Sequence, residues 1–191
     1  LASNLCPRRL NRQAVWDYLT FRYVPGPETI WQNIWKLPPG HIMEWSPNEE
    51  PRLSRYWRSD VISVDDPIDI DQKTKEFEDL FLDSVAKRLL ASDVPVGVML
   101  SGGLDSSSIA AAAVELGHKP FHTFSVGFSE GGEYSELGYA RQVARHLGLE
   151  NHEVVVDQSR FLEMLPHAVQ TGDGPLADLT IVPLLAVSQL A

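Results

Sequence analysis

The sequence predicts an α/β protein in which helices flank a parallel β-sheet. Three short apolar stretches near residues 94–100, 120–128 and 152–156 have the character of strands, and longer stretches of helical character lie between them. Such alternation favours a parallel sheet with helices on both faces. Apolar residues make up 43% and charged residues 22% of the 191 residues, as is typical of a globular protein.

The first strand leads into a turn that is rich in glycine. Residues 94–100 form a short apolar run, which we expect to be buried on both faces. The glycine loop, residues 101–107, reads Ser-Gly-Gly-Leu-Asp-Ser-Ser. The Ala-rich run from Ser108 to Leu116 then predicts a helix that ends at Gly117.

A loop of this composition is suited to binding an anion. Two adjacent glycines allow a tight turn, and Asp105 or Ser106 is expected to cap the helix. The unpaired N–H groups of the first helical turn favour a phosphate group, and the hydroxyls of Ser101, Ser106 and Ser107 add donors. A carboxylate repels phosphate, so Asp105 suggests that a hard cation such as Mg2+ lies between them.

The glycine loop resembles the pyrophosphate loop of the ATP pyrophosphatase (PP-loop) superfamily. It lacks the Gly-Lys-Ser/Thr ending of the common NTPase loop and the three-glycine spacing of dinucleotide folds. The resemblance implies an adenine nucleotide alpha-hydrolase-like fold. It also implies cleavage of ATP to AMP and pyrophosphate while a substrate is adenylated.

Residues 1–60 carry a second resemblance. The runs Tyr18-Leu-Thr-Phe-Arg-Tyr-Val-Pro-Gly-Pro27 and Ile34-Trp-Lys-Leu-Pro-Pro-Gly-His41 resemble the end of the glutaminase domain of glutamine-dependent asparagine synthetases. We therefore expect residues 1–60 to be the C-terminal part of an α+β glutaminase-like domain. Residues 61–191 would be the N-terminal part of an ATP-binding synthetase domain, with a polar connector over 59–70.

The family resemblance implies an ATP-dependent amidotransferase that uses Mg2+. A carboxylate, expected to be aspartate, would be adenylated with release of pyrophosphate. Ammonia derived from glutamine would then displace AMP and form asparagine. We expect small-molecule partners, no nucleic acid because the net charge is −10, and no membrane. A single cysteine, Cys6, fits the cytoplasm, and a homodimer is left open.

The expected nucleotide site joins the glycine loop to the end of the second strand. In the asparagine synthetase pattern, the Val of a Ser-Val-Gly-Phe strand end lies against the adenine, and Val126 holds that position here. Asp105 is the expected metal ligand, and no catalytic side chain is assigned. The expected nucleotide-binding residues are Leu100, Ser101, Gly102, Gly103, Leu104, Asp105, Ser106, Ser107, Val126 and Gly127.

Helices and strands elsewhere are predicted from caps and apolar spacing. Three helices are expected from their caps, at Asn11, Ser159 and Thr180, and the helix capped by Ser159 is expected to be interrupted or restarted at Pro166. Two more are expected over Asp71–Ala91, which should pack on the sheet, and over Tyr134–Leu147. Two strands are expected over His41–Trp45 and Leu53–Trp57. Five tryptophans between positions 16 and 57 are expected to pack in a core or an interface.

Other motifs point away from metal or nucleophile chemistry outside the glycine loop. The spacing of the six histidines is not that of a metal site. His146, at the end of a predicted helix, and His152, at the start of the next predicted strand, are expected to be the nearest pair. Cys6 is followed by Pro7, whereas the family glutaminase begins with Cys-Gly, so Cys6 is expected to be incidental. Gly174 stands where the family's Asp-Glu-Pro segment has Glu, which weakens any inference about the acceptor.

Two alternatives to asparagine synthesis stay open at this point. The family's second acidic motif, Ser-Gly-Glu-Gly-Ser-Asp-Glu, does not occur in the sequence, so we expect an internal piece of a longer protein. A related adenylating cyclase that forms a β-lactam or a macrolactam would share the glycine loop. A non-catalytic nucleotide-binding module would share it as well.

Overall fold

The computed structural model describes residues 6–59, 69–117, 121–129, 135–172, 174–175 and 177–191. Two compact units are present, one of Leu1–Asp65 with Val169–Asp178 and the other of Asp66–Ala168 with Leu179–Ala191. Along the chain the elements are α1 (Arg12–Phe21), β1 (His41–Glu44), β2 (Arg52–Arg55), α2 (Ile70–Leu90), β3 (Val98–Met99), α3 (Leu104–Glu115), β4 (His122–Phe128), α4 (Leu137–Leu147), β5 (Glu150–Val156), α5 (Gln158–Thr171) and α6 (Ile181–Leu190).

The first unit holds α1 and one β-hairpin. The side chain of Asn11 accepts hydrogen bonds from the backbone N–H groups of Gln13 and Ala14, which confirms it as the cap of α1. Strands β1 and β2 pair antiparallel, with His41 opposite Arg55, so the two predicted strands are also confirmed.

The tryptophans of this unit do not form a core within the described residues. Trp16, Trp35, Trp45 and Trp57 are each exposed by 60% or more. Packing in a core of this chain is therefore wrong for these four, and packing in an interface stays a prediction. The physical reason is that a short helix and a two-stranded hairpin offer too little surface to cover large indole rings.

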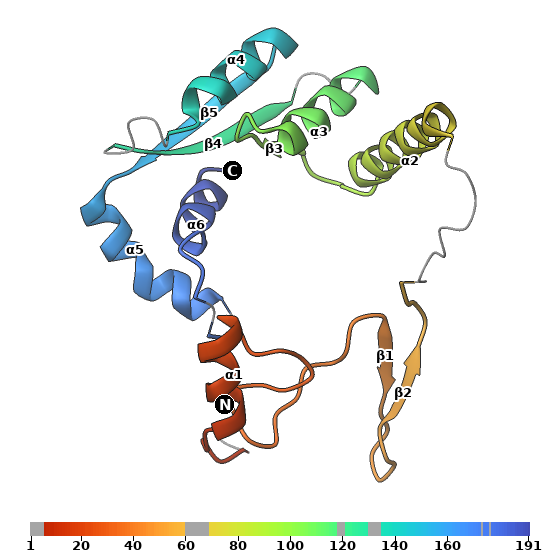
Figure 1. Cartoon of the computed structure of the whole chain (residues 1–191), viewed down its shortest axis with the longest axis vertical. Helices are drawn as coiled ribbons and strands as arrows, with labels where there is room; N and C mark the ends of the chain where they lie inside the picture. The colour runs from red at the N-terminus through yellow and green to blue at the C-terminus, as the bar shows by residue number, and fades with distance from the viewer. Residues whose placement is uncertain (1–5, 60–68, 118–120, 130–134, 173, 176) are drawn as a thin grey trace. The chain divides into compact units, whose positions relative to one another are not determined.

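The second unit contains a three-stranded parallel sheet in the order β3-β4-β5, which confirms the predicted fold class (Figure 1). Helix α6 covers one face, where Ala186 and Val187 pack on Val154 and Val156. Helices α3 and α4 cover the other face. Helices therefore flank the sheet on both sides.

Alanines form the contact between α3 and α4. Ala110, Ala140 and Ala144 are almost completely buried together with Leu100 at the end of β3. Small side chains let the two helices approach each other and the sheet closely. This packing fixes the start of α3, and with it the glycine loop.

Helix α2 confirms the long predicted helix but packs differently from the expectation. Its main neighbour is α3, through Val85, Ala112 and Ala113, and not the sheet surface itself. Phe77 and Leu80, two of the apolar residues that recur at helical spacing in this helix, are 67% and 68% exposed. The helix extends beyond α3, so its first turns have nothing to pack against in the described chain.

Three further expectations about helix and strand ends are corrected. The first sheet strand covers only Val98–Met99 and Met99 is 45% exposed, because β3 pairs with one neighbour only within the described sheet. Asp157, not Ser159, caps α5 by accepting the N–H of Arg160 at 2.7 Å. Helix α5 continues through Pro166, although a proline removes one N–H donor from the helix.

The predicted connector between the two domains falls largely outside the described residues. The connector over 59–70 coincides mostly with 60–68, so the predicted domain boundary near residue 60 stays a prediction.

Among the described helices, none has the length and apolar character needed to cross a membrane.

Candidate functional site

The glycine loop lies between the end of β3 and the first turn of α3. Helix α3 begins at Leu104, four residues earlier than predicted, so Asp105 and Ser106 lie inside its first turn. Gly103 is the N-cap residue and no side chain caps the helix, which corrects the expected Asp105 or Ser106 cap. Since the first N–H groups of an α-helix have no partner within the helix, this end is open to an anion.

Two serine hydroxyls hold the loop in its turn. The Oγ atoms of Ser101 and Ser106 lie 3.0 Å apart, and the N–H of Ser101 donates to Ser106 Oγ at 3.2 Å. The N–H of Gly103 donates to Ser101 Oγ at 3.2 Å. These local bonds keep the loop preorganised, which lowers the entropic cost of ordering it around a ligand.

Gly102 is the residue of the loop at which the backbone most clearly requires glycine. Its φ is +85°, and a Cβ atom there would lie 2.6 Å from the backbone N of Ala140 and 2.6 Å from the carbonyl carbon of Tyr139. The loop therefore passes directly against the start of α4. Only glycine allows both this conformation and this close approach.

Most of the loop faces solvent. Ser101, Gly103, Leu104 and Asp105 are exposed, whereas Ser107 is partly buried. Ser107 Oγ itself is buried and has no hydrogen-bond partner among the described residues. It borders a cavity of about 520 Å3 between α3 and α4, lined by Ser107, Ala111, Gln142, Val143, Arg145, His146 and Leu147.

The loop's donor set fits an Mg2+-bound phosphate. The Asp105 carboxylate is exposed in the first turn of α3. Hard cations such as Mg2+ bind oxygen ligands and usually keep several waters. One carboxylate beside N–H groups that favour phosphate is a suitable arrangement for such an ion.

The end of β4 lies at the same edge of the sheet as the glycine loop. The N–H of Leu100 donates to the carbonyl of Phe124 at 2.8 Å, so Val126 and Gly127 extend beyond Leu100 along the neighbouring strand. Val126 is partly buried on the α6 face. Gly127 is buried on the α4 face, and a Cβ atom there would lie 2.3 Å from Leu137 Cδ1.

A polar network that sequence reasoning missed joins the three strands. Ser125 Oγ lies 2.6 Å from the carbonyl oxygen of Leu100 and 2.9 Å from Asn151 Oδ1. Thr123 Oγ1 lies 2.9 Å from the same Asn151 oxygen. Thr123 and Ser125 are buried. Alternation along strands could have suggested that these residues face inward, but the pairing register could not be read from the sequence.

An ion pair extends this network to α4. Arg141 donates to both carboxylate oxygens of Glu153, at 2.8 and 2.6 Å, and Asn151 Nδ2 donates to Glu153 at 3.0 Å. The hydrogen bond from Arg141 lowers the pKa of the Glu153 carboxyl, although burial opposes the change. The same bond raises the pKa of the Arg141 guanidinium. The pair fixes α4, against which Gly102 lies, to β5.

The first unit contains a larger cavity of about 960 Å3. Its lining residues come from the segment after α1 and from the end of α5: Tyr23, Val24, Thr29, Ile30, Trp31, Ile34, Trp35, Lys36, Leu37, Gln170, Gly172, Gly174 and Pro175. The backbone N–H of Ala177 donates to the carbonyl of Arg22 at 2.9 Å. Asp173, the residue before Gly174 in the segment that resembles the family's Asp-Glu-Pro run, lies outside the described residues.

The histidines are arranged differently from the sequence expectation. His122 and His152 are brought within hydrogen-bonding distance of each other, whereas His146 lines the cavity between α3 and α4. Strand pairing brings His122 and His152 together. His122 lies opposite Glu150 on the neighbouring strand, and His152 is two residues further along that strand, on the same face.

Comparison with known proteins identifies the family. The family model described as Asparagine synthase matches residues 76–191, well over half of the chain and including the whole glycine loop. Asparagine synthetase [glutamine-hydrolyzing] 1 of Bacillus subtilis is 36% identical over 182 residues, and a putative asparagine synthetase [glutamine-hydrolyzing] of Mycobacterium bovis is 34% identical over 189 residues. Each match covers 95% of this chain but 28% of the relative.

A solved structure is also similar to part of the chain. An NH3-dependent NAD synthetase from Campylobacter jejuni aligns with a TM-score of 0.40 and 14% identity, covering 61% of this chain and 51% of that one. The family assignment depends on the sequence match over residues 76–191. On that match, the chain belongs to the asparagine synthase family.

Proposed function

We propose that this chain is part of an ATP-dependent amidotransferase of the asparagine synthetase type. The observation that supports it most directly is the glycine loop, which presents the uncapped N-terminus of α3 within the segment that matches the family. On this proposal, residues 1–60 belong to a glutaminase-like domain and residues 61–191 to the synthetase domain. A cytoplasmic location, suggested by the single cysteine, and a homodimer are parts of the proposal that need separate tests.

The nucleotide would bind along the edge formed by the loop and β4. Gly102, Gly103 and the first N–H groups of α3 would hold the phosphates, and Ser101, Ser106 and Ser107 would donate hydroxyl hydrogen bonds. Val126 and Gly127 would lie against the adenine and ribose, with Leu100 and Leu104 on either side of the turn. Asp105 would hold Mg2+, which when bound neutralises phosphate charge.

The reaction proposed has two steps. A carboxylate oxygen of aspartate attacks the α-phosphorus of ATP, and the bond to the bridging oxygen breaks to release pyrophosphate. Ammonia released from glutamine then attacks the acyl carbon, loses a proton, and displaces AMP to give asparagine. The role of the loop is to hold charge in place with preorganised N–H groups, which is the main source of catalysis in such chemistry.

The first test compares Mg-ATP binding by the protein and by its Asp105→Asn variant in a calorimeter. We expect binding that requires Mg2+ and is weaker by about tenfold or more in the variant. Asp93→Asn, an exposed carboxylate before β3, is the matched control and should bind as the parent does. Equal binding by all three proteins would contradict the assignment of Asp105.

The second test measures AMP and asparagine formed from ATP, aspartate and ammonia or glutamine. Release of AMP that depends on aspartate supports asparagine synthesis. Release that depends on a different carboxylic acid would identify an adenylating cyclase or another relative. Binding of Mg-ATP without AMP release under any of these conditions would identify a nucleotide-binding module.

A further inference from the structure

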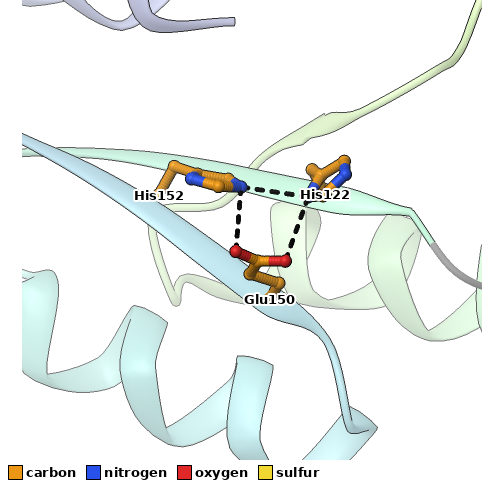
Figure 2. Close-up of side chains that lie close together, drawn as sticks. All are labelled: His122, Glu150 and His152. Atoms are coloured by element: carbon orange, nitrogen blue, oxygen red, sulfur yellow. Dashed lines mark hydrogen bonds and ion pairs between the residues drawn. The ribbon is translucent and has the colours of Figure 1, made fainter.

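Two histidines and one glutamate converge at the amino ends of β4 and β5. Figure 2 shows His122 on β4 facing Glu150 and His152, both on β5. His122 Nδ1 lies 3.0 Å from His152 Nε2 and 3.6 Å from a carboxylate oxygen of Glu150. His152 Nε2 lies 3.7 Å from the other oxygen of Glu150. One possible ligand atom from each of the three residues lies within 4.8 Å of the other two.

Strand pairing creates this arrangement. His122 is opposite Glu150 and Phe124 is opposite His152 in the parallel register. Because side chains alternate along a strand, these residues point to the same face of the sheet. The glycine loop follows the carboxyl end of the neighbouring strand β3, so the cluster is separate from the site described above.

We propose that His122, Glu150 and His152 bind a divalent transition-metal ion of the Zn2+ class. Zinc lies about 2.0–2.1 Å from imidazole nitrogen and carboxylate oxygen, so ligands of a tetrahedral site are about 3.3 Å apart. The two imidazole nitrogens are 3.0 Å apart, and each lies 3.6 or 3.7 Å from a different carboxylate oxygen of Glu150, so the cluster is close to that spacing. Imidazole nitrogens favour Zn2+ over Mg2+ and Ca2+, which prefer oxygen ligands.

The surroundings hold the ligands in place and leave room for water. The Phe124 ring stacks on the His152 ring with centroids 5.4 Å apart and planes at 24°, which restricts the imidazole. On the opposite face, Thr123 and Ser125 meet Asn151 and fix the register of the two strands. The side chain of His122 is 52% exposed and that of Glu150 67% exposed, so solvent can supply the remaining ligands.

A metal at this position would tie β4 to β5 at the edge opposite the glycine loop. It would link residues that are separated by α4 in the sequence and would stabilise the folded chain, because the unfolded chain offers no preformed site. The net charge of −10 favours the approach of cations. A metal ion here would stabilise the fold, and the proposal does not depend on the proposed reaction.

The test is a titration of the protein with Zn2+ in competition with a chromogenic chelator. Excess Mg2+ is present to occupy oxygen sites, and a Cys6→Ser background removes the free thiol, which also binds zinc. We expect one tightly bound Zn2+ per chain. The variants His122→Ala, His152→Ala and Glu150→Gln should each weaken binding by at least about tenfold. His146→Ala, an exposed histidine on α4, is the matched control and should bind as the background does.

Two further readouts make the result decisive. Co2+ in place of Zn2+ should show a visible absorption band of low-coordinate nitrogen ligation, lost in the His122→Ala and His152→Ala variants. Zn2+ should raise the thermal unfolding midpoint of the background protein but not of these variants, with circular dichroism confirming that they are folded. Absence of Zn2+ binding by the folded background, or equal binding by the ligand variants, would overturn the proposal. The two histidines would then simply be a hydrogen-bonded pair.

Discussion

The Oγ atom of Ser125 lies 2.6 Å from the carbonyl oxygen of Leu100, so a side chain of β4 holds the residue that joins β3 to the glycine loop. Both residues are almost completely buried. Strand β3 itself has only two residues, and this bond extends the contact between the two strands beyond the ladder. The position of the loop therefore depends on a residue far from it in the sequence.

Replacing Ser125 with Ala should destabilise the protein and disturb the loop. The carbonyl of Leu100 would lose a donor in a buried place, which costs about 1–3 kcal/mol. Urea unfolding would measure the loss. Ser188→Ala, an exposed serine near the end of α6, is the control and should change the unfolding free energy by less than about 0.5 kcal/mol. Equal effects of the two changes would contradict the assigned role of Ser125.

Gly102→Ala should be among the most damaging small substitutions in the second unit. The added Cβ meets the backbone of Ala140 and Tyr139 at 2.6 Å, and φ is +85°, so both the contact and the conformation are unfavourable. We expect a loss of at least about 1–2 kcal/mol, measured by chemical denaturation.

Gly138→Ala offers a matched comparison on α4. A Cβ atom at Gly138 meets nothing within 4 Å, and the residue lies within a helix. This change should leave the protein unaltered or stabilise it by up to about 1 kcal/mol, because alanine restricts the unfolded chain and favours the helix. Destabilisation by Gly138→Ala as large as that by Gly102→Ala would contradict the close approach at Gly102.

Ala110→Leu should destabilise the contact between α3 and α4. Ala110 is fully buried against Ala140 and Ala144, and extra methylene groups in a packed core cost about 1–3 kcal/mol. Ala111→Leu, one residue further along the same helix, faces the cavity and should be tolerated. Thermal unfolding of the two variants would separate packing from helix propensity, which is the same in both.

The ion pair between Arg141 and Glu153 should make stability depend on pH in the acid range. The folded state lowers the pKa of the Glu153 carboxyl below its ordinary value of 4.5. The ion pair therefore contributes fully to the free energy of unfolding above pH 4.5. This contribution is lost as the pH falls through the lowered pKa of Glu153. The stability difference between the parent and Glu153→Gln should shrink as the pH falls in that range.

Glu163→Gln on α5 is the control for this measurement, because Glu163 is exposed. At neutral pH this change should alter the unfolding free energy by less than about 0.5 kcal/mol. A constant difference between the parent and Glu153→Gln from neutral to strongly acid pH would show that the ion pair does not control the titration of Glu153.

Local signals in the sequence were sufficient to predict many of the helices and strands. Asn11 was identified as a cap from its residue type, and helix α2 was predicted nearly to its ends from apolar spacing. The start of α3 was misplaced because Leu104, Asp105 and Ser106 follow two glycines and look like loop residues. The packing of Ala110 on α4 extends the helix over them, and such a tertiary contact leaves no local signal.

The site was predictable only where its residues are contiguous. The glycine loop could be identified as a phosphate-binding motif because its seven residues follow one another. Ser125, Asn151 and the pair of His122 and His152 depend on which residues of β4 and β5 face each other. A shift of the register by one residue would send each of these side chains to the other face, so only the structure identifies them.

The strand order β3-β4-β5 repeats the order in which the strands leave the ribosome. Each strand can therefore pair with its predecessor once both have been synthesised, without waiting for a later strand. The face of β5 carrying Val154 and Val156 is covered only when Ala186 and Val187 of α6 have been made. We expect the nascent chain that has finished β5 but lacks α6 to be the stage most prone to aggregation and most dependent on chaperones.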